Sequence, residues 1–411
     1  MRVIEQEASV AAYLNTDAAS SDTPFSFPLS TILNEEGFEA AQREISLWPG
    51  YQATPLHFLP TLAAELGMGA LYYKDESFRF NLKSFKALGG AYAVLRVLEQ
   101  QISKLHPGVT VSAEEILSGQ YRQATAAMTV TCATDGNHGR SVAWGAKMFG
   151  CRCVIYVHAT VSQARVQAIE AFGAEVVRVP GNYDDSVRHA AEQARRHGWT
   201  VVSDTTYAGY RDIPIDVMHG YGVMAREVIS QLHGEPPTHV IVQAGVGALA
   251  ASVCAVFWQH WQSRRPRLIV VEPEQAACFF QSGQQGRPVA VPGELDTVMA
   301  GLACGEVSPL AWDILRPGVQ VYSMVGDDYA LEAMCRFAQP KGLDPAIVSG
   351  ETGAAGLALL LAARKAPHVW QLLGLDQDSR VLLVGSEGDT DASLYEKIVG
   401  KPAGEVLGRE F

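Results

Sequence analysis

The stretch Asn81-Leu82-Lys83-Ser84-Phe85-Lys86-Ala87-Leu88-Gly89-Gly90 is the most informative part of this sequence. It follows the aromatic-rich run Leu71-Tyr72-Tyr73 and a polar turn, and it has the composition of a helix start. An amine that attacks a carbonyl group must lose its proton near neutral pH, and a half-buried helix N-terminus disfavours an ammonium ion. Lys86 is therefore a candidate for covalent chemistry, although a solvated lysine is the commoner meaning of such a tripeptide.

Composition limits the class of protein. The chain has 411 residues, which is enough for about two domains. Its net charge of −12 argues against nucleic acid or an anionic membrane as the main partner. No apolar run reaches the roughly 18 residues that a membrane helix needs. The first residues lack the apolar block of a signal peptide, so a cytoplasmic location is expected. No cluster of cysteine and histidine has metal-ligand spacing, and no metal site is expected.

Strand-like and helix-like segments alternate after Pro55. The strand-like runs are short, rich in Val and Ile, and apolar on both faces, as the central strands of parallel sheets must be. This alternation predicts an α/β fold with helices on both sides of a sheet. The expected strands are 71–73, 128–132, 153–157, 176–179, 201–204, 239–243, 268–272 and 381–385. The expected helices are 84–98, 137–149, 163–172, 184–197, 220–232, 248–260, 327–337 and 353–364.

Two glycine-containing loops each follow an expected strand and open an expected helix. In Thr134-Asp135-Gly136-Asn137-His138-Gly139, small residues allow close approach of a ligand, and the helix N-terminus offers N–H groups for a carboxylate. In Gln243-Ala244-Gly245-Val246-Gly247-Ala248, backbone N–H groups can hold a phosphate. Ordinary turn chemistry is the alternative for the first loop. Dinucleotide binding is the alternative for the second, but the full glycine fingerprint is missing.

Four motifs in this order resemble those of the tryptophan synthase β-like, fold type II enzymes that depend on pyridoxal 5′-phosphate (PLP). They are Ser84-Phe85-Lys86, Asp135-Gly136-Asn137-His138-Gly139, Gly245-Val246-Gly247 and the loop at Ser386. Longer phrases resemble the diaminopropionate ammonia-lyases within that group. These phrases are Lys74-Asp75-Glu76-Ser77, Arg79-Phe80-Asn81, His219-Gly220-Tyr221-Gly222, Met299-Ala300-Gly301-Leu302-Ala303-Cys304-Gly305-Glu306, Ser349-Gly350-Glu351-Thr352-Gly353-Ala354 and Glu387-Gly388-Asp389-Thr390-Asp391.

The resemblance implies a two-domain fold in which each domain is a mostly parallel twisted sheet flanked by helices. Residues 1–83 and 199–411 would form a large, discontinuous PLP-binding domain. Residues 84–198 would form a small mobile domain, with a surface insertion near 100–123. The cofactor would be PLP and the partner a small amino acid substrate, and the enzyme would be a homodimer, as two-fold assemblies commonly are.

The motifs also assign roles to the expected site residues. Lys86 would hold the cofactor as a Schiff base, and Asn137 would donate to its ring hydroxyl oxygen. Ser386 would face the pyridine nitrogen; a neutral serine there leaves the nitrogen largely unprotonated and favours elimination over transamination. The N–H groups of the phosphate loop are those of Gly245, Val246, Gly247 and Ala248. The substrate carboxylate would bind at Thr134, Gly136 and His138, with the His138 side chain packed and hydrogen-bonded.

Asp135 is where this sequence departs from the usual fold type II motif, and the change indicates the substrate. Most fold type II enzymes have Ser or Ala there, whereas a carboxylate favours the protonated form of a β-amine and can act as a base on Cα. Asp204, at the end of an expected strand, is the second candidate base, with a turn aspartate as the alternative. The resemblance implies bases on opposite faces of the substrate and elimination from both D- and L-2,3-diaminopropionate, giving pyruvate and two ammonia. A serine or threonine dehydratase and a catalytically silent PLP-binding protein are the rival interpretations.

Overall fold

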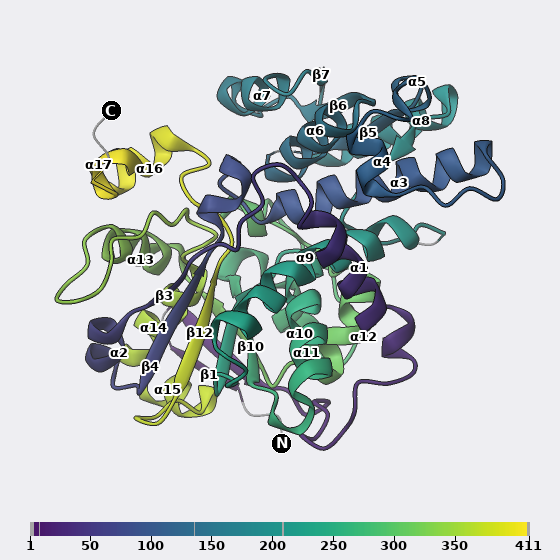
Figure 1. Cartoon of the computed structure of the whole chain (residues 1–411). Coiled ribbons are helices and arrows are strands. Elements are labelled where there is room, and N and C mark those ends of the chain that lie inside the picture. The colour runs from purple at the N-terminus through teal and green to yellow at the C-terminus, as the bar shows by residue number, and fades with distance from the viewer. Residues whose placement is uncertain (1–3, 8, 135, 208, 409–411) are drawn as a thin grey trace. The chain divides into compact units, whose positions relative to one another are not determined.

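The structure, a computed structural model, describes residues 4–7, 9–134, 136–207 and 209–408, and it forms two compact units (Figure 1). The first unit comprises Met1–Glu35, Ala53–Ser84 and Met224–Phe411, and the second comprises Glu36–Gln52 and Phe85–Val223. The second unit thus includes 36–52 and 199–223, which the sequence-based division places in the large domain. The functional division into a PLP-binding domain and a mobile domain stays a prediction.

The first unit contains an eight-stranded sheet in the order β1-β2-β11-β10-β9-β12-β4-β3. The central strands from β11 to β4 are parallel, and β1, β2 and β3 add antiparallel pairs at the edges. The strands are β1 (Ile4–Glu7), β2 (Val10–Leu14), β3 (Leu56–Phe58), β4 (Ala70–Asp75), β9 (His239–Gln243), β10 (Arg267–Pro273), β11 (Val321–Val325) and β12 (Arg380–Gly385).

Both faces of this sheet are buried. In β9 the consecutive residues Val240, Ile241 and Val242 are all fully buried, although their side chains alternate between the two faces. Helix α14 (Ala355–Lys365) contacts β9, β10, β11 and β12 and closes a core that contains Ile241 and Leu383. Figure 1 shows α10 (Ala248–Trp261) and α12 (Pro309–Gly318) on the other side of the strands.

The remaining helices of the first unit surround this core. They are α2 (Pro60–Leu66), α11 (Cys278–Gln285), α13 (Asp327–Ala338), α15 (Pro367–Leu373), α16 (Ala392–Val399) and α17 (Ala403–Val406). Short 3-10 helices lie at η1 (Leu29–Thr31), η2 (Glu76–Asn81), η3 (Gln262–Arg264), η4 (Glu274–Ala276) and η5 (Ala300–Leu302).

The second unit contains a four-stranded parallel sheet in the order β7-β6-β5-β8. Its strands are β5 (Thr129–Ala133), β6 (Arg152–His158), β7 (Glu175–Val179) and β8 (Thr200–Val201). Its helices are α3 (Lys86–Leu105), α4 (Ala113–Leu117), α5 (Arg122–Ala126), α6 (Asn137–Phe149), α7 (Gln163–Glu170) and α8 (Tyr183–His197). Helices α1 (Glu35–Ile45) and α9 (Asp212–Gln231) each have residues in both units. The predicted α/β architecture is confirmed.

Helices α3 and α6 approach each other closely at a glycine. A Cβ added to Gly145 would lie 2.7 Å from the Cα of Ala91 and 2.9 Å from its Cβ. Any side chain at this position would force the helices apart, so Gly145 fixes the direction of α3, the helix that begins at Lys86.

The stretch 100–123, expected as a surface insertion, consists of the end of α3, α4, the start of α5 and the loops between these helices. The Ser112 hydroxyl and the Glu115 carboxylate cap α4 reciprocally. Among the described residues, no helix is long and apolar enough to cross a membrane.

Candidate active site

Lys86 is the first residue of α3, and its amine is paired with a carboxylate. Its Nζ donates a hydrogen bond to Asp204 Oδ2 at 2.5 Å, and the two side chains are 22% and 17% exposed. The same Nζ lies 5.3 Å from the ring centre of Phe85 and 5.7 Å from that of Tyr221. The amine is therefore half-buried beside two aromatic rings and still accessible to a small ligand.

The position of Tyr221 depends on the crossing of α3 and α9. A Cβ at Gly220 would lie 2.9 Å from the carbonyl carbon of Leu88 and 3.0 Å from the Cα of Gly89. The backbones can approach this closely because Gly220 has no side chain. The phrase His219-Gly220-Tyr221-Gly222 resembles the family, but the sequence alone predicts no role for Tyr221. In the structure its ring lies beside the Lys86 amine.

Asp204 follows the short strand β8, and a tyrosine holds its segment in place. The Tyr210 hydroxyl accepts from the N–H of Ser203 at 2.8 Å and donates to the carbonyl of Val201 at 3.0 Å. One side chain thus fixes the backbone on the N-terminal side of Asp204. Tyr210 is a supporting residue that sequence analysis did not identify.

His138 completes this cluster in the second unit. Its Nε2 lies 2.8 Å from the carbonyl of Val202, and its Nδ1 lies 3.8 Å from Asp204 Oδ2. A carbonyl only accepts, so Nε2 carries a proton, and in the neutral ring Nδ1 presents its lone pair. Nδ1 is buried and has no hydrogen-bond partner in the described part of the chain.

The pKa values in this cluster follow from burial and charge. Burial acts to raise the pKa of Asp204, but the charges of Lys86 and His138 and the hydrogen bond from Lys86 outweigh it. The pKa of this carboxyl is therefore held well below its usual range, and Asp204 is ionised near neutral pH. Burial lowers the pKa of His138, with Asp204 opposing and Lys86 adding to the shift, so the ring is neutral.

The loop between β5 and α6 contains the other expected residues of the second unit. Thr134 Oγ1 accepts from the N–H groups of Gly136 at 3.2 Å and Gly139 at 3.3 Å, so it caps the loop. The N–H of Gly136, expected to bind the substrate carboxylate, is thus already used within the protein. Asn137 is the first residue of α6. Asp135 lies outside the described residues.

In the first unit, the glycine loop after β9 has the features of an anion site. Gly247 caps α10 with φ +99°, and a Cβ there would lie 2.7 Å from Phe279 Cε2 and 3.0 Å from Ala311 Cβ, so only glycine is tolerated. No side chain caps this helix. Among the described residues, no acceptor bonds to the N–H groups of Val246, Gly247 or Ala248. Free N–H groups at a helix N-terminus are suited to a phosphate.

A second family phrase lies against this loop. A Cβ at Gly245 would lie 3.0 Å from Cys304 Sγ and 3.2 Å from the carbonyl oxygen of Gly301. The part of this phrase from Gly301 to Cys304 therefore packs against the glycine loop. Cys304 and Cys278 do not form a disulfide.

Ser386 follows β12 directly and is 1% exposed. Gln243, the last residue of β9, donates from Nε2 to Ser386 Oγ at 2.6 Å. Because β9 and β12 are neighbours in the parallel sheet, their carboxyl ends bring these residues together. Gln243 was quoted within the glycine motif but was given no role from the sequence.

Further family phrases meet at the same end of the sheet. The N–H of Gly350 donates to the carbonyl of Glu387 at 3.0 Å, and the N–H of Gly388 donates to the carbonyl of Lys83 at 2.9 Å. Lys83 Nζ also pairs with Asp389 at 2.6 Å. These contacts fix the loop that contains Ser386.

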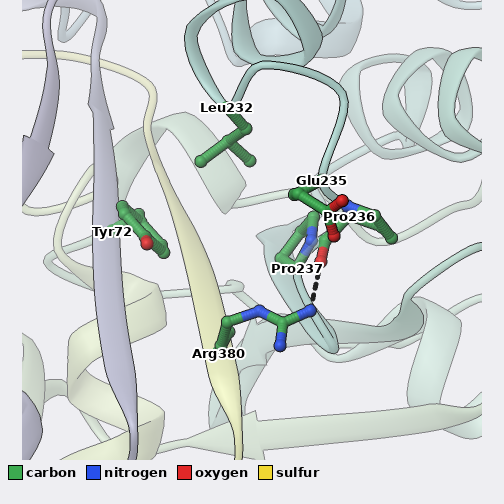
Figure 2. Close-up of a pocket in the computed structure, with 6 residues that line it drawn as sticks. All are labelled: Tyr72, Leu232, Glu235, Pro236, Pro237 and Arg380. Atoms are coloured by element: carbon green, nitrogen blue, oxygen red, sulfur yellow. Dashed lines mark hydrogen bonds between the residues drawn. The ribbon is translucent and has the colours of Figure 1, made fainter.

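The pocket in Figure 2 lies elsewhere in the first unit. It has a volume of about 290 Å³ and is lined by Tyr72, Leu232, Glu235, Pro236, Pro237 and Arg380. Arg380 begins β12 and donates to the carbonyl of Pro236 at 2.9 Å (Figure 2). The pocket is therefore near the amino end of β12, whereas parallel sheets place ligands at carboxyl ends, so it is not the candidate site.

The residues present fit PLP. The uncapped N–H groups at Val246–Ala248 suit its phosphate, the buried hydroxyl of Ser386 suits its ring nitrogen, and the half-buried amine of Lys86 suits its aldehyde. The contacts described above hold each of these groups in place within its own unit.

The comparisons with known proteins agree with this chemistry. The model of the pyridoxal-phosphate dependent enzyme family matches residues 47–373. Diaminopropionate ammonia-lyase from Escherichia coli (strain K12) is 42% identical over 355 residues, covering 85% of this chain and 88% of the relative.

Two solved structures of the Escherichia coli diaminopropionate ammonia-lyase are also similar to this chain. The complex with an aminoacrylate-PLP azomethine reaction intermediate has a TM-score of 0.84 at 37% identity and covers 97% of this chain and 98% of that one. The complex with D-serine has a TM-score of 0.85 at 37% identity and covers 98% and 100%. The resemblance seen in the motifs is thus confirmed, and this chain belongs to the pyridoxal-phosphate dependent enzymes and, within them, to the family of the diaminopropionate ammonia-lyases.

Proposed function

We propose that this protein is a PLP-dependent lyase that eliminates ammonia from D- and L-2,3-diaminopropionate. The β-amine leaves first, and water then converts the remaining enamine to pyruvate and a second ammonia. The observation that carries this proposal is the amine of Lys86 at 2.5 Å from the carboxylate of Asp204, in a chain of this family. A lysine that becomes nucleophilic once it loses a proton and a carboxylate that can accept a proton thus lie side by side at a half-buried position.

Lys86, the glycine loop and Ser386 each have a supporting feature in the structure, and Asn137 is proposed from its motif. Lys86 would bond to the aldehyde, and the N–H groups of Gly245–Ala248 would bind the phosphate. Asn137 would donate to the ring hydroxyl oxygen, and Ser386 would bond to the ring nitrogen. When bound, PLP supplies an electron sink for the carbanion at Cα.

Asp204 is proposed as one of two bases that act on Cα. In the free protein it is ionised and paired with Lys86. Once the Lys86 nitrogen loses its positive charge, the main opposing charge disappears, and burial then raises the pKa of the carboxyl. Asp204 Oδ2 would therefore become a stronger proton acceptor after the lysine has reacted, which is when a base is needed.

His138 can accept a hydrogen bond from Asp204 once Asp204 has taken up the proton from Cα. Its Nδ1 lies 3.8 Å from Asp204 Oδ2, and its lone pair has no partner among the described residues. The substrate carboxylate is proposed to bind at Thr134, Gly136 and His138. Because the Thr134 hydroxyl already accepts two N–H groups in the free protein, substrate would have to displace part of this capping.

Asp135 remains the proposed second base on the basis of the sequence motif. It would take the proton from the opposite enantiomer and favour the ammonium form of the leaving β-amine. We further propose that the enzyme is a homodimer, because two-fold assemblies are the commonest oligomers. We also propose that it acts in the cytoplasm.

The test is to incubate the purified holoenzyme with D- and L-diaminopropionate and to measure pyruvate and ammonia. We expect two ammonia for each pyruvate from both enantiomers. Faster turnover of threonine or serine than of either diaminopropionate would favour a dehydratase. PLP binding without turnover of any of these amino acids would favour a silent binding protein.

A further inference from the structure

The amide of Gln243 is held in one orientation. Its side chain is buried, and three acceptors lie within hydrogen-bond distance of Nε2: Ser386 Oγ at 2.6 Å and the carbonyls of Val384 at 3.0 Å and Thr352 at 3.2 Å. The NH₂ group has two protons, so one points to Ser386 Oγ, the nearest acceptor, and the two carbonyls share the other. Carbonyl oxygens only accept, so the nitrogen and not the oxygen of the amide must face them. The opposite orientation would place the amide oxygen against two carbonyl oxygens, neither of which has a proton to donate.

This orientation determines what the Ser386 hydroxyl can do. An amide NH₂ group donates and does not accept, so Ser386 Oγ must accept from Gln243. The hydroxyl proton is then directed away from Gln243. Ser386 has no other hydrogen-bond partner in the described part of the chain, so its proton is available to a ligand.

We propose that Gln243 is a positioning residue that forces the Ser386 hydroxyl to donate to the ring nitrogen of the cofactor. The inference rests on the proposed function. A hydroxyl that donates occupies the lone pair of the nitrogen and keeps it unprotonated, whereas a hydroxyl free to accept would tolerate a protonated ring. Gln243 therefore favours elimination and suppresses the transamination that a protonated ring promotes.

No charged side chain in the described part of the chain forms a hydrogen bond with either residue, so the ring nitrogen would meet a neutral pair. In the observed orientation Gln243 Oε1 is buried without a hydrogen-bond partner among the described residues, whereas the opposite orientation would set it against two carbonyl oxygens, which costs more. The carbonyls of Thr352 and Val384 thus orient the Gln243 amide, and the amide in turn sets the direction of the Ser386 hydroxyl proton.

The experiment measures the protonation of the ring nitrogen directly. The protein is loaded with PLP carrying ¹⁵N in the ring, and the nitrogen chemical shift is followed against pH. In the natural protein, we expect an unprotonated nitrogen at neutral pH. A protonated ring in the natural protein would overturn the inference without any variant.

Two variants supply the contrast. Gln243→Met removes the donor and frees the hydroxyl to rotate, and Gln243→Glu adds an acceptor that draws the Ser386 proton away from the ring. Each should raise the pKa of the ring nitrogen by about one unit or more, a tenfold higher protonated fraction. Each should also increase transamination relative to elimination. An unchanged shift in both variants would contradict the proposal.

Matched controls separate positioning from packing. Gln231 also donates to a backbone carbonyl, that of Thr54 at 2.8 Å, so Gln231→Met removes a comparable amide without touching Ser386. Its ring nitrogen should behave as in the natural protein, and the same shift there would overturn the proposal. In a Ser386→Ala background, Gln243→Met should add no further change.

Failure of the proposed function gives a different result. If the natural protein forms no reducible bond between Lys86 and PLP, the cofactor assignment itself fails and the inference falls with it. If that bond forms but Gln243 has no effect on the ring nitrogen, only the role of Gln243 is rejected.

Discussion

Each unit of the molecule contains a cluster of charged side chains, and the two clusters differ in how completely their atoms are satisfied. The cluster in the first unit, here called the buried ion network, is 0–3% exposed. Its hydrogen bonds from lysine and arginine to carboxylates range from 2.6 to 2.8 Å. It consists of Lys74, Glu76, Arg79 and Glu227.

The cluster in the second unit is built from the same kinds of group but is more open. Lys86 and Asp204 are 22% and 17% exposed, and His138 Nδ1 has no hydrogen-bond partner among the described residues. A saturated network holds its protons and its geometry, whereas the open cluster has room for a ligand and an acceptor for a proton. The comparison suggests that the first cluster stabilises the fold and the second carries the chemistry.

Replacing Lys86 gives the largest expected effect. Lys86→Ala should lower pyruvate formation by about 1,000-fold or more, because both the covalent bond and the proton-handling amine are lost. Absorbance of the holoenzyme and mass spectrometry after borohydride reduction check the bond to PLP. Lys83→Ala is the matched control. Lys83 lies three positions before Lys86, is 40% exposed and pairs with a different carboxylate, that of Asp389. Equal losses in both variants would contradict the assignment of Lys86.

Breaking the buried ion network should affect stability instead. Arg79→Met leaves Glu76 and Glu227 without their shared partner, and we expect a loss of about 3–5 kcal/mol in the free energy of unfolding. PLP occupancy of the folded fraction should not change. Lys365→Met, which removes an exposed pair with Glu332, should cost about 1 kcal/mol or less. Urea unfolding measures both, and a small effect of Arg79→Met would show that the network is not a stabilising element.

Removing the charge of Asp204 tests the chemistry of the open cluster. Asp204→Asn should lower kcat on one enantiomer of diaminopropionate by about 100-fold, because one of the two proposed bases is lost. The other enantiomer should be affected much less. The measurement is kcat of the variant on the D form and on the L form separately. Equal losses on both would reject the assignment of two bases.

The sequence predicts the core of the fold well because the central strands are apolar on both faces. The expected strand 239–243 coincides with β9, and all eight expected strands overlap observed ones. Strand β11 was missed because Ser323 interrupts its apolar run; the hydroxyl donates to the carbonyl of Val270 at 2.7 Å. The edge strands β1, β2 and β3 were missed as well, since short antiparallel edges give a weak pattern.

The sequence predicts which motifs contribute to the site, but it does not predict which residues of these motifs are in contact. Lys86 and Asp204 were each found from the sequence, but they are 118 positions apart, and only the fold brings them to 2.5 Å. Gln243 and Ser386 are 143 positions apart and meet because β9 and β12 are neighbours. Tyr210 and Tyr221 gave no signal in the sequence that separates them from ordinary core aromatics.

Glu272 is a third kind of buried carboxylate, because it belongs to neither of the two clusters and has no cation beside it among the described residues. Its oxygens accept from the N–H groups of Phe279 and Phe280, each at 2.7 Å, and it forms no ion pair in the described part of the chain. Burial outweighs these hydrogen bonds and raises its pKa from 4.5 to about 8. A carboxyl with a raised folded-state pKa stabilises the fold most at low pH, and this stability is lost as the pH rises towards 8.

The pH dependence of unfolding gives the smallest expected effect when it is measured over a single pH unit. Between pH 5 and 8, Glu272 should lower the free energy of unfolding by up to about 1.4 kcal/mol per pH unit, because the folded state keeps a proton that the unfolded chain releases. Glu272→Gln cannot titrate, so its unfolding free energy, measured in urea at several pH values, should lack this part of the slope. Asp204→Asn serves as the contrast: the pKa of Asp204 is lowered by its cation, so its contribution stays constant across this range and is lost only in acid. Parallel curves for the natural protein and Glu272→Gln would show that the hydrogen bonds from the two phenylalanine N–H groups stabilise the ionised carboxylate enough to replace a cation.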